Sequence, residues 1–350
     1  MQAIFGIIFH FIGGFASGSF YIPYKKVKKW KWESYWIVGG IFSWLIVPAT
    51  AAWITVPEIL TVLKNTDIKV LLITYFLGAM WGIGGLTFGL AMRYLGMSLG
   101  MSVALGFCSA FGALIPPIYV DILSINQMPG ILYMLNNLSG QTVLLGVIVC
   151  LIGIAICGKA GARKEKELSK AQKQKSIQEF NFKKGIVVAI ISGILSACMS
   201  FAIAAGQDIA IAAESAGANP LFRNNATFIV IMFGGLTTNF IWCMILNYKN
   251  KSFGDYSNSK LPLRRNYIFS ALAGTTWFLQ YFFYGMGESK LGNGASSWIL
   301  HMAFIILISN MWGFILGEWK GVSKGTLTYI LVGIVTIILS VVFVGYGNSL

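Results

Sequence analysis

Ten long apolar segments dominate this chain of 350 residues. They cover residues 3–24, 34–56, 69–92, 94–118, 139–158, 185–206, 226–247, 267–287, 294–316 and 325–346. Each is close to the roughly 20 residues that a helix needs to cross the hydrocarbon core of a bilayer. The strands of a membrane barrel would instead alternate apolar and polar residues over short segments. The sequence therefore predicts an all-α polytopic membrane protein with ten transmembrane helices.

The composition excludes most soluble classes of protein. Hydrophobic residues make up 56% of the chain and charged residues 11%, whereas an ordinary soluble domain is about 25% charged. The five cysteines lie in apolar runs without a C-x-x-C motif or a Cys/His cluster, which predicts small buried side chains and neither disulfides nor a metal site. Walker, G-x-S-x-G and H-E-x-x-H motifs are absent from the sequence. We therefore expect no enzyme, no bound metal and no organic cofactor.

The positive charge is distributed unevenly between the apolar segments. The chain has 26 Lys and Arg against 12 Asp and Glu, and 22 of the cations follow the first, third, fifth, seventh or ninth segment. In a soluble protein such an excess would suggest nucleic acid. Between membrane spans, Lys and Arg instead favour the cytoplasmic side. This pattern predicts cytoplasmic basic connections, both termini outside, the lipid bilayer as surroundings and no nucleic-acid partner.

The two halves of the chain resemble each other. Residues Gly6, Gly14 and Ser17 recur at an offset of 179 as Gly185, Gly193 and Ser196. A second series recurs at an offset of 196, pairing Gly78 with Gly274, Trp81 with Trp277, Phe88 with Tyr284 and Leu95 with Leu291. We interpret residues 1–158 and 185–350 as two five-helix repeats, joined by a basic cytoplasmic linker at 159–184. Because five is odd, the second repeat is inverted, an architecture typical of secondary transporters.

Several long stretches resemble one known family. They are FYIPYKKVKKWKWESYW (20–36), GAMWGIG (78–84), GLAMRYLGMSLG (89–100), SFAIAAG (200–206), WFLQYFFYG (277–285) and SWILHM (297–302). These are similar to the L-rhamnose–proton symporter (RhaT) family of the drug/metabolite transporter superfamily. The resemblance implies proton-coupled uptake of L-rhamnose or a related deoxy sugar across a bacterial inner membrane. Segments 288–296 and 119–140 look divergent.

Three ionisable side chains in the apolar segments are candidates for carrying the coupling proton. His10 lies in the first segment, His301 in the ninth, and Glu288 ends the eighth. Ionisable groups inside a membrane are costly and therefore suggest function, and imidazole exchanges protons near neutrality. A second interpretation of each histidine, a neutral ring donating one interhelical hydrogen bond, stays open. So does an ordinary interfacial ion pair of Glu288 with Lys290.

The candidate sugar contacts combine flat rings with polar groups. A sugar needs aromatic rings against its C–H faces and amide or hydroxyl partners for its hydroxyls, since a buried unpaired hydroxyl costs about 1–3 kcal/mol. The candidates are Trp81, Trp277, Gln280, Tyr281, Tyr284, Trp298 and Asn225. Helical spacing brings 277, 281 and 284 to one face of the eighth segment. Core packing, an interfacial belt and, for Asn225, hydrogen bonding between helices are the alternative interpretations.

Two other functions remain open at this point. An exporter of the same superfamily would commonly use an intramembrane acid, and the first segment contains none. A non-transporting receptor or a membrane enzyme is the other alternative. No pair of segments brings together a metal triad or a nucleophile with its base, and the repeat favours a carrier.

Overall fold

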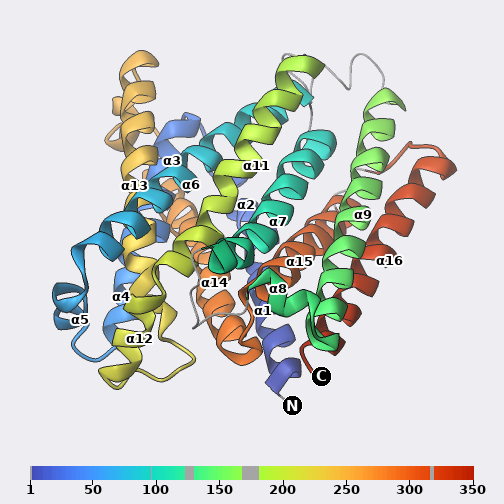
Figure 1. Ribbon diagram of the computed structural model, residues 1–350. Coiled ribbons are helices and arrows are strands. Elements are labelled where there is room, and N and C mark those ends of the chain that lie inside the picture. Colours follow the sequence, from blue (N-terminus) through green and yellow to red (C-terminus); the bar gives the residue numbers. More distant parts are fainter. Residues whose placement is uncertain (1, 96, 123–129, 168–180, 316–318) are drawn as a thin grey trace.

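The computed structural model describes residues 2–95, 97–122, 130–167, 181–315 and 319–350. Within these ranges the chain forms helices and connections and no strand, which confirms the all-α class (Figure 1). The first half contains α1 (Gln2–Ser19), α2 (Tyr21–Tyr24), α3 (Trp32–Ile41), the π-helix η1 (Phe42–Ile46), α4 (Val47–Thr55), α5 (Ile59–Asn65), α6 (Ile68–Leu95), α7 (Met97–Ile122), α8 (Ile131–Leu135) and α9 (Leu138–Glu167). The second half contains α11 (Phe182–Ala205), α12 (Gln207–Ser215), α13 (Asn224–Lys249), the 3₁₀-helix η2 (Phe253–Tyr256), α14 (Leu263–Leu291), α15 (Gly294–Ile315) and α16 (Lys324–Gly347).

Nine helical segments in the described part of the chain are long and apolar enough to span a membrane. Each overlaps one of the predicted segments, so the multi-pass character is supported by length and apolarity. The helix that matches the remaining segment, α14, has 29 residues but is less apolar. It carries two arginines at its start and Gln280, Tyr281, Tyr284 and Glu288 in its second half. The polar residues expected at the site therefore contribute to the lower apolarity of this helix, together with the arginines.

The ends of the helices agree with the predicted boundaries to within a few residues, except at the basic linker. There, α9 continues to Glu167 and α11 begins at Phe182, so helical structure extends into both ends of the interval 159–184. Residues 168–180 of that interval lie outside the described part of the chain.

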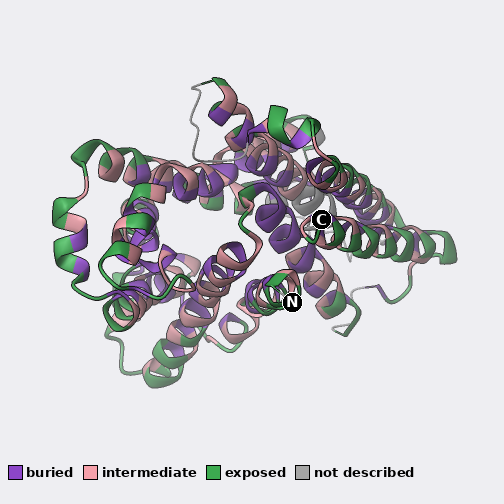
Figure 2. Cartoon of the chain, turned by 60° about the horizontal axis from the view of Figure 1, so that its bottom comes forward, coloured by how far each residue is buried: buried purple, intermediate pink, exposed green. Residues whose placement is uncertain are grey.

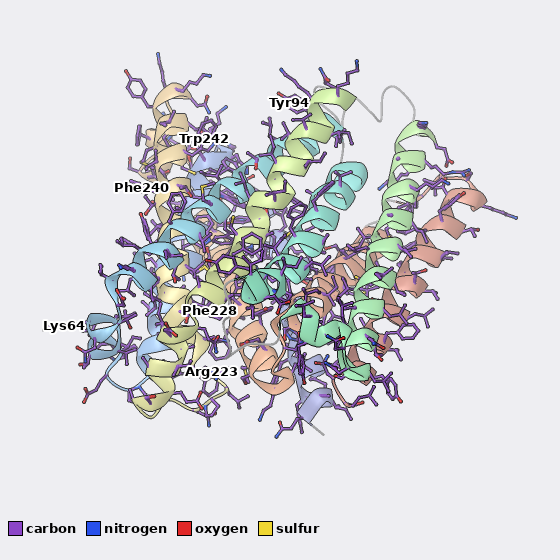
Figure 3. The ribbon with its side chains drawn as sticks, in the orientation of Figure 1. Lys64, Tyr94, Arg223, Phe228, Phe240 and Trp242 are labelled. Carbon is purple, nitrogen blue, oxygen red and sulfur yellow. The ribbon has the colours of Figure 1, made fainter. Side chains whose placement is uncertain are left out.

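The connections divide between two ends of the bundle. Figure 1 shows both termini at the lower end, together with α5 and α12. In Figure 3, Lys64 and Arg223 lie at this lower end and Tyr94 at the opposite one. The basic segment 25–31 is attached near the start of α14, where the Lys28 N–H donates to Asn266 Oδ1 at 3.0 Å. Its Lys31 N–H donates to Asp255 Oδ2 at 2.8 Å, in η2 after α13.

Helices from the two halves interleave. Helix α1 packs against α14 and α15, α11 packs against α6 and α7, and α9 lies along α16. Glycines permit the closest approaches, because a Cβ at Gly78 would collide with the Ile231 carbonyl and one at Gly274 with the Gly39 carbonyl. Such contacts bring helix backbones together, as small residues do in membrane bundles. Figure 2 shows the buried residues between these helices and exposed residues on outward faces.

Apolar side chains also cover much of the exterior. Trp53 is 70% exposed and Ile54 75% exposed on α4, and the outward face of α16 presents a further row of aliphatic residues. Exposed apolar surface on this scale marks an interaction surface, and it lies on helices that are long and apolar enough to span a membrane. All five cysteines are buried and free, as predicted.

A π-helix interrupts the second predicted span. The Val47 N–H donates to the Phe42 carbonyl, five residues back, and Pro48 follows directly. Proline has no N–H for the carbonyl of residue 44, so the regular ladder cannot continue here. Such widened turns are frequent at functional sites. Here the turn contains Trp44, which is 5% exposed.

At the end of α9, Glu167 caps the start of α16. Its Oε1 accepts hydrogen bonds from Ser323 Oγ at 2.7 Å and Thr326 Oγ1 at 2.6 Å, and its Oε2 accepts from the Ser323 N–H at 2.6 Å. The bond from Thr326, followed by those from Ser323, lowers the pKa of Glu167 to about 2. Carboxylates near a helix N-terminus are favoured.

Replacing Glu167 with glutamine should lower the melting temperature at neutral pH. Because the folded-state pKa is depressed, the stabilisation is present above the ordinary pKa near 4.5 and is lost as pH falls through about 2. The difference between Glu167→Gln and the parent protein should therefore shrink between pH 5 and pH 2, measured by thermal unfolding in detergent. The exposed Glu58, whose side chain makes no capping bond to α5, gives the control Glu58→Gln. An equal effect of both substitutions would contradict the capping role.

Candidate functional site

The two histidines come from opposite ends of the chain and meet in the interior. His10 on α1 and His301 on α15 are both fully buried, and their ring centroids lie 6.0 Å apart. Both ring nitrogens of each histidine are buried without a hydrogen-bond partner. The neighbouring backbone comes very close: a Cβ at Gly287 would stand 2.7 Å from His10 Nε2, and one at Gly13 would stand 3.3 Å from His301 Cε1. Glycines on α14 and α1 therefore make room for the two rings.

Tyr284 joins the two histidines. Its ring centroid lies 5.3 Å from that of His10 and 5.3 Å from that of His301. Trp298, one turn before His301 on α15, lies 6.0 Å from Tyr284 and donates its indole N–H to the Cys108 carbonyl on α7 at 3.1 Å. Trp298 and His301 therefore both contact Tyr284.

A group of stacked aromatic rings continues from the histidines. Trp81 on α6 and Trp277 on α14 stack with centroids 5.4 Å apart and an interplanar angle of 29°. Tyr281 lies 5.3 Å from Trp277 and 6.3 Å from His301, so it connects the stack to the histidines. Trp81 and Trp277, which the sequence relates by an offset of 196, thus meet face to face. The side chain of Gln280 is buried beside them and donates to the Trp277 carbonyl at 3.0 Å.

Trp277 also faces a small hollow that the sequence did not suggest. The hollow is lined by Phe20, Tyr24, Trp36, Gly40, Ser43, Trp44, Gly274 and Trp277. Trp44 lies 5.9 Å from Trp277 and 6.1 Å from Trp36, and Trp36 donates its indole N–H to Asn239 Oδ1 at 3.0 Å. The only sequence signal for Trp44 was Pro48 four residues later, inside an apolar run. We name Trp44, Trp81, Trp277 and Tyr281 the aromatic cluster.

Glu288 is held at the end of α14 by a partner from another helix. It is 9% exposed, and its Oε2 accepts a hydrogen bond from Asn224 Nδ2 at 2.5 Å. Glu288 lies one turn beyond Tyr284, on the same face of α14. Arg223, next to Asn224, forms an ion pair with Glu214 on α12 at 3.0 Å. Glu288 is therefore bonded to an amide of α13 and not to Lys290.

Asn225 lies apart from the other candidates. Its Nδ2 donates to Thr55 Oγ1 on α4 at 2.9 Å, so its side chain links two helices. That contact fits the alternative of hydrogen bonding between helices, and a role in binding substrate stays a prediction. The remaining candidates form one connected group, which runs from Trp81 through Tyr281 to His10.

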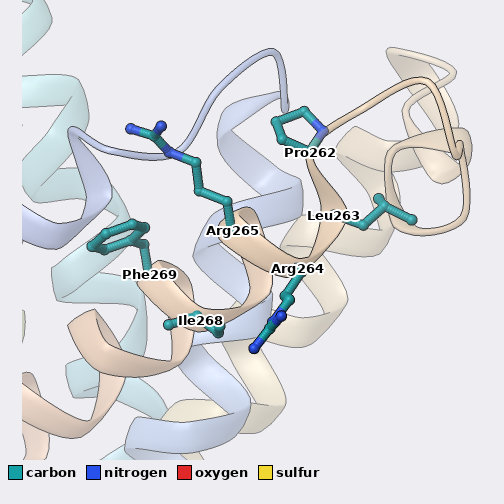
Figure 4. Close-up of a pocket in the computed structure, with 6 residues that line it drawn as sticks. All are labelled: Pro262, Leu263, Arg264, Arg265, Ile268 and Phe269. Atoms are coloured by element: carbon teal, nitrogen blue, oxygen red, sulfur yellow. The ribbon is translucent and has the colours of Figure 1, made fainter.

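A second, open hollow lies at the start of α14 (Figure 4). It is lined by Pro262, Leu263, Arg264, Arg265, Ile268 and Phe269. Arg265 donates from Nε to the Lys26 carbonyl at 2.9 Å and lies over the Phe269 ring. These arginines belong to the basic end of the bundle, more than two turns from Trp277, so this hollow is not part of the site.

Comparison with known proteins agrees with the resemblance seen in the sequence. The sequence model of the family described as L-rhamnose-proton symport protein (RhaT) matches residues 1–349. A protein of Yersinia pestis (strain Pestoides F) named L-rhamnose-proton symporter is 40% identical over 351 residues, covering 99% of this chain and 98% of its own. A protein of Yersinia pseudotuberculosis serotype O:1b (strain IP 31758) with the same name is equally similar. The predicted family is confirmed, and it is a family of transporters rather than enzymes: the chain belongs to the L-rhamnose-proton symport protein family.

Proposed function

We propose that this protein takes up L-rhamnose, or a closely related deoxy sugar, together with a proton across the bacterial inner membrane. The observation that carries the proposal is the 40% identity, over 99% of the chain, to proteins named L-rhamnose-proton symporter. The buried histidines and the aromatic cluster support it, because they supply the two kinds of group that such a symporter needs. We expect the proton to be the only coupling ion, without metal or cofactor.

The proposed architecture is ten spans in two inverted repeats, 1–158 and 185–350, joined by the linker 159–184. The tenth span is α14, whose 29 residues are long enough to cross a bilayer at 1.5 Å per residue. Two contacts between the halves support the repeat, because the offsets in the sequence convert one contact into the other. Gly6 packs against Leu291 and Gly185 packs against Leu95, and these four residues are related by the offsets of 179 and 196.

The proposed sugar site is the aromatic cluster with Gln280 and Tyr284. Trp277 is half-buried and faces the small hollow, so a sugar ring has access to its indole face when the helices move apart. Alternating access by rocking of inverted repeats would expose the same residues to each side in turn. The methyl group of a deoxy sugar suits the apolar rings around it.

The membrane potential is sufficient to drive accumulation. One positive charge crossing 100 mV releases about 2.3 kcal/mol, and about 1.4 kcal/mol corresponds to a tenfold concentration ratio. One proton per sugar therefore supports accumulation by tens of times. The histidines and Glu288 are the proposed carriers of that proton.

Uptake of radiolabelled L-rhamnose by cells that produce the protein tests the proposal. We expect saturable uptake that a protonophore abolishes, with L-rhamnose preferred to L-fucose, L-mannose and L-lyxose. Cells carrying the empty vector are the control. Absence of protonophore-sensitive uptake of all four sugars would contradict the symport function.

Both termini are proposed to face the periplasm. The four cations outside the basic connections include Lys64 and Arg223, at the end of the bundle that carries the termini. Alkaline phosphatase fused after Leu350 should therefore be active, whereas fusion after Tyr248, near the basic end, should not. Reversed activities of the two fusions would mean the opposite orientation.

A further inference from the structure

His10 and His301 present four ring nitrogens in one place without a partner. A neutral imidazole has one donor and one acceptor, and leaving either unpaired in the interior is costly. Native proteins satisfy nearly all such groups. Two imidazoles without hydrogen-bond partners, both in contact with the Tyr284 ring, therefore indicate a binding site for a proton or a ligand. With both rings fully buried and glycine backbone close to each, a proton fits this site better than a bulky ligand.

The distance between the two rings allows them to act on each other without a direct bond. Ring centroids of directly hydrogen-bonded imidazoles lie about 5 Å apart, since the nitrogens must come within about 3 Å. Here the centroids are 6.0 Å apart, so the rings are neighbours that stand about 1 Å beyond direct hydrogen bonding. Two positive charges at this distance in a dry interior repel strongly. The first proton bound therefore opposes the second, and the pair titrates as one unit.

Few other titratable groups face the pair. Tyr281, Tyr284 and, one turn farther, Glu288 belong to α14, and Cys108 on α7 lies beside Trp298 and Tyr281. Helix α16 touches α1 at Gly345, which carries no titratable group. Glu288 is the one acid among these described neighbours, and Asn224 holds it. Its single negative charge can neutralise one protonated histidine and not two.

The equivalent corner of the other repeat is apolar. The offset of 179 relates His10 to Ala189, and the offset of 196 relates Tyr284 to Phe88 and His301 to Leu105. Ala189 is buried in a cluster with Ala91, Leu95 and Ala104, and Phe88 packs against it. The same three-helix corner thus occurs twice in the chain, and only the corner of α1, α14 and α15 carries imidazoles.

We propose that His10 and His301 form a single proton-binding unit that holds one proton between them in each transport cycle. The apolar corner around Ala189 leaves the molecule with one such unit in place of two. This inference rests on the proposed proton symport and specifies its proton site. It differs from a separate role for either histidine, because each ring then depends on the other.

Nitrogen NMR on the full chain in lipid nanodiscs tests the unit directly. The protein contains two histidines in all, so ¹⁵N-histidine labelling reports on this pair alone. We expect the signals of both imidazoles to change together in one step that binds one proton. Two independent steps, or no protonation of either ring between pH 4 and pH 9, would overturn the proposal.

Transport by substituted proteins in liposomes gives a second test. His10→Gln and His301→Gln should each lower L-rhamnose-driven proton uptake at least tenfold. The double variant should take up protons as fast as the slower of the two single variants, because residues that act as a unit have non-additive effects. Loss in the double variant equal to the product of the single losses would show independent sites. If a histidine variant does not fold, the NMR titration of the parent protein decides between one unit and two independent sites. If the parent protein moves no protons with rhamnose, the symport proposal fails, while the NMR titration still decides whether the histidines form a unit.

Discussion

Replacing Trp277 with alanine should raise the L-rhamnose concentration for half-maximal uptake by about ten- to a hundredfold. Trp277 stacks on Trp81, contacts Trp44 and Tyr281, and lines the small hollow. It is half-buried, whereas the other three rings of the aromatic cluster are buried. Aromatic contacts contribute about 0.5–1.5 kcal/mol beyond the area they bury, and removal of the face also loses that area. Together these correspond to one or two factors of ten in affinity.

Uptake measured over a range of sugar concentrations checks this prediction. Trp53→Ala is the matched control, because Trp53 is 70% exposed on the outside of α4. It should leave the half-maximal concentration unchanged. Trp277→Phe, which keeps a ring, should give an intermediate value. A well-folded Trp277→Ala protein with the parent's half-maximal concentration would remove Trp277 from the sugar site.

Replacing Gly78 with valine should prevent stable assembly of the bundle. A Cβ at residue 78 would collide with the Ile231 carbonyl on α13, and Gly234 of the same helix approaches Gly78 in return. Backbone on both sides cannot move aside as a flexible side chain can. Overpacking of a well-packed interior costs about 1–3 kcal/mol, occasionally more, and native stability is only about 5–15 kcal/mol. Gly78→Val should therefore lower the melting temperature by several degrees or abolish the folded protein.

The control for this prediction lies two turns farther along α6. A Cβ at Gly85 would meet nothing within 4 Å, so Gly85→Val adds an apolar group on an open face. It should elute as a single peak in size-exclusion chromatography, with a melting temperature close to that of the parent protein. Equal melting temperatures for the two variants would show that the α6–α13 contact does not limit stability.

The sequence predicted the elements of this fold well because each signal was local. A membrane span is recognised from about 20 consecutive residues, and the long helices begin and end close to the predicted limits, except that α9 continues into the predicted linker. The shared face of Trp277, Tyr281 and Tyr284 also follows from helical spacing alone. Helix α14, which matches the predicted segment 267–287, is less apolar than the nine segments that qualify as membrane spans.

The sequence could not predict which side chains of different helices meet. Asn224 and Asn225 are adjacent in the chain, yet Asn224 bonds Glu288 and Asn225 bonds Thr55. Neighbouring residues on a helix point about 100° apart, so their partners depend on which helices flank α13. Trp44 likewise reaches Trp277 from a π-helical turn, a local geometry that periodicity does not reveal.

Apolar length and charge distribution therefore predicted a multi-pass membrane protein from the sequence alone, and the resemblance of several long stretches indicated the L-rhamnose-proton symport protein family. Only the tertiary structure decided that His10 and His301 meet, each in contact with Tyr284. The two histidines lie at nearly opposite ends of the sequence. Their meeting depends on α1 packing closely against α14 and α15 through Gly6, Gly13 and Gly14. Packing of that kind is a property of complementary surfaces in three dimensions, which one helix's sequence does not specify.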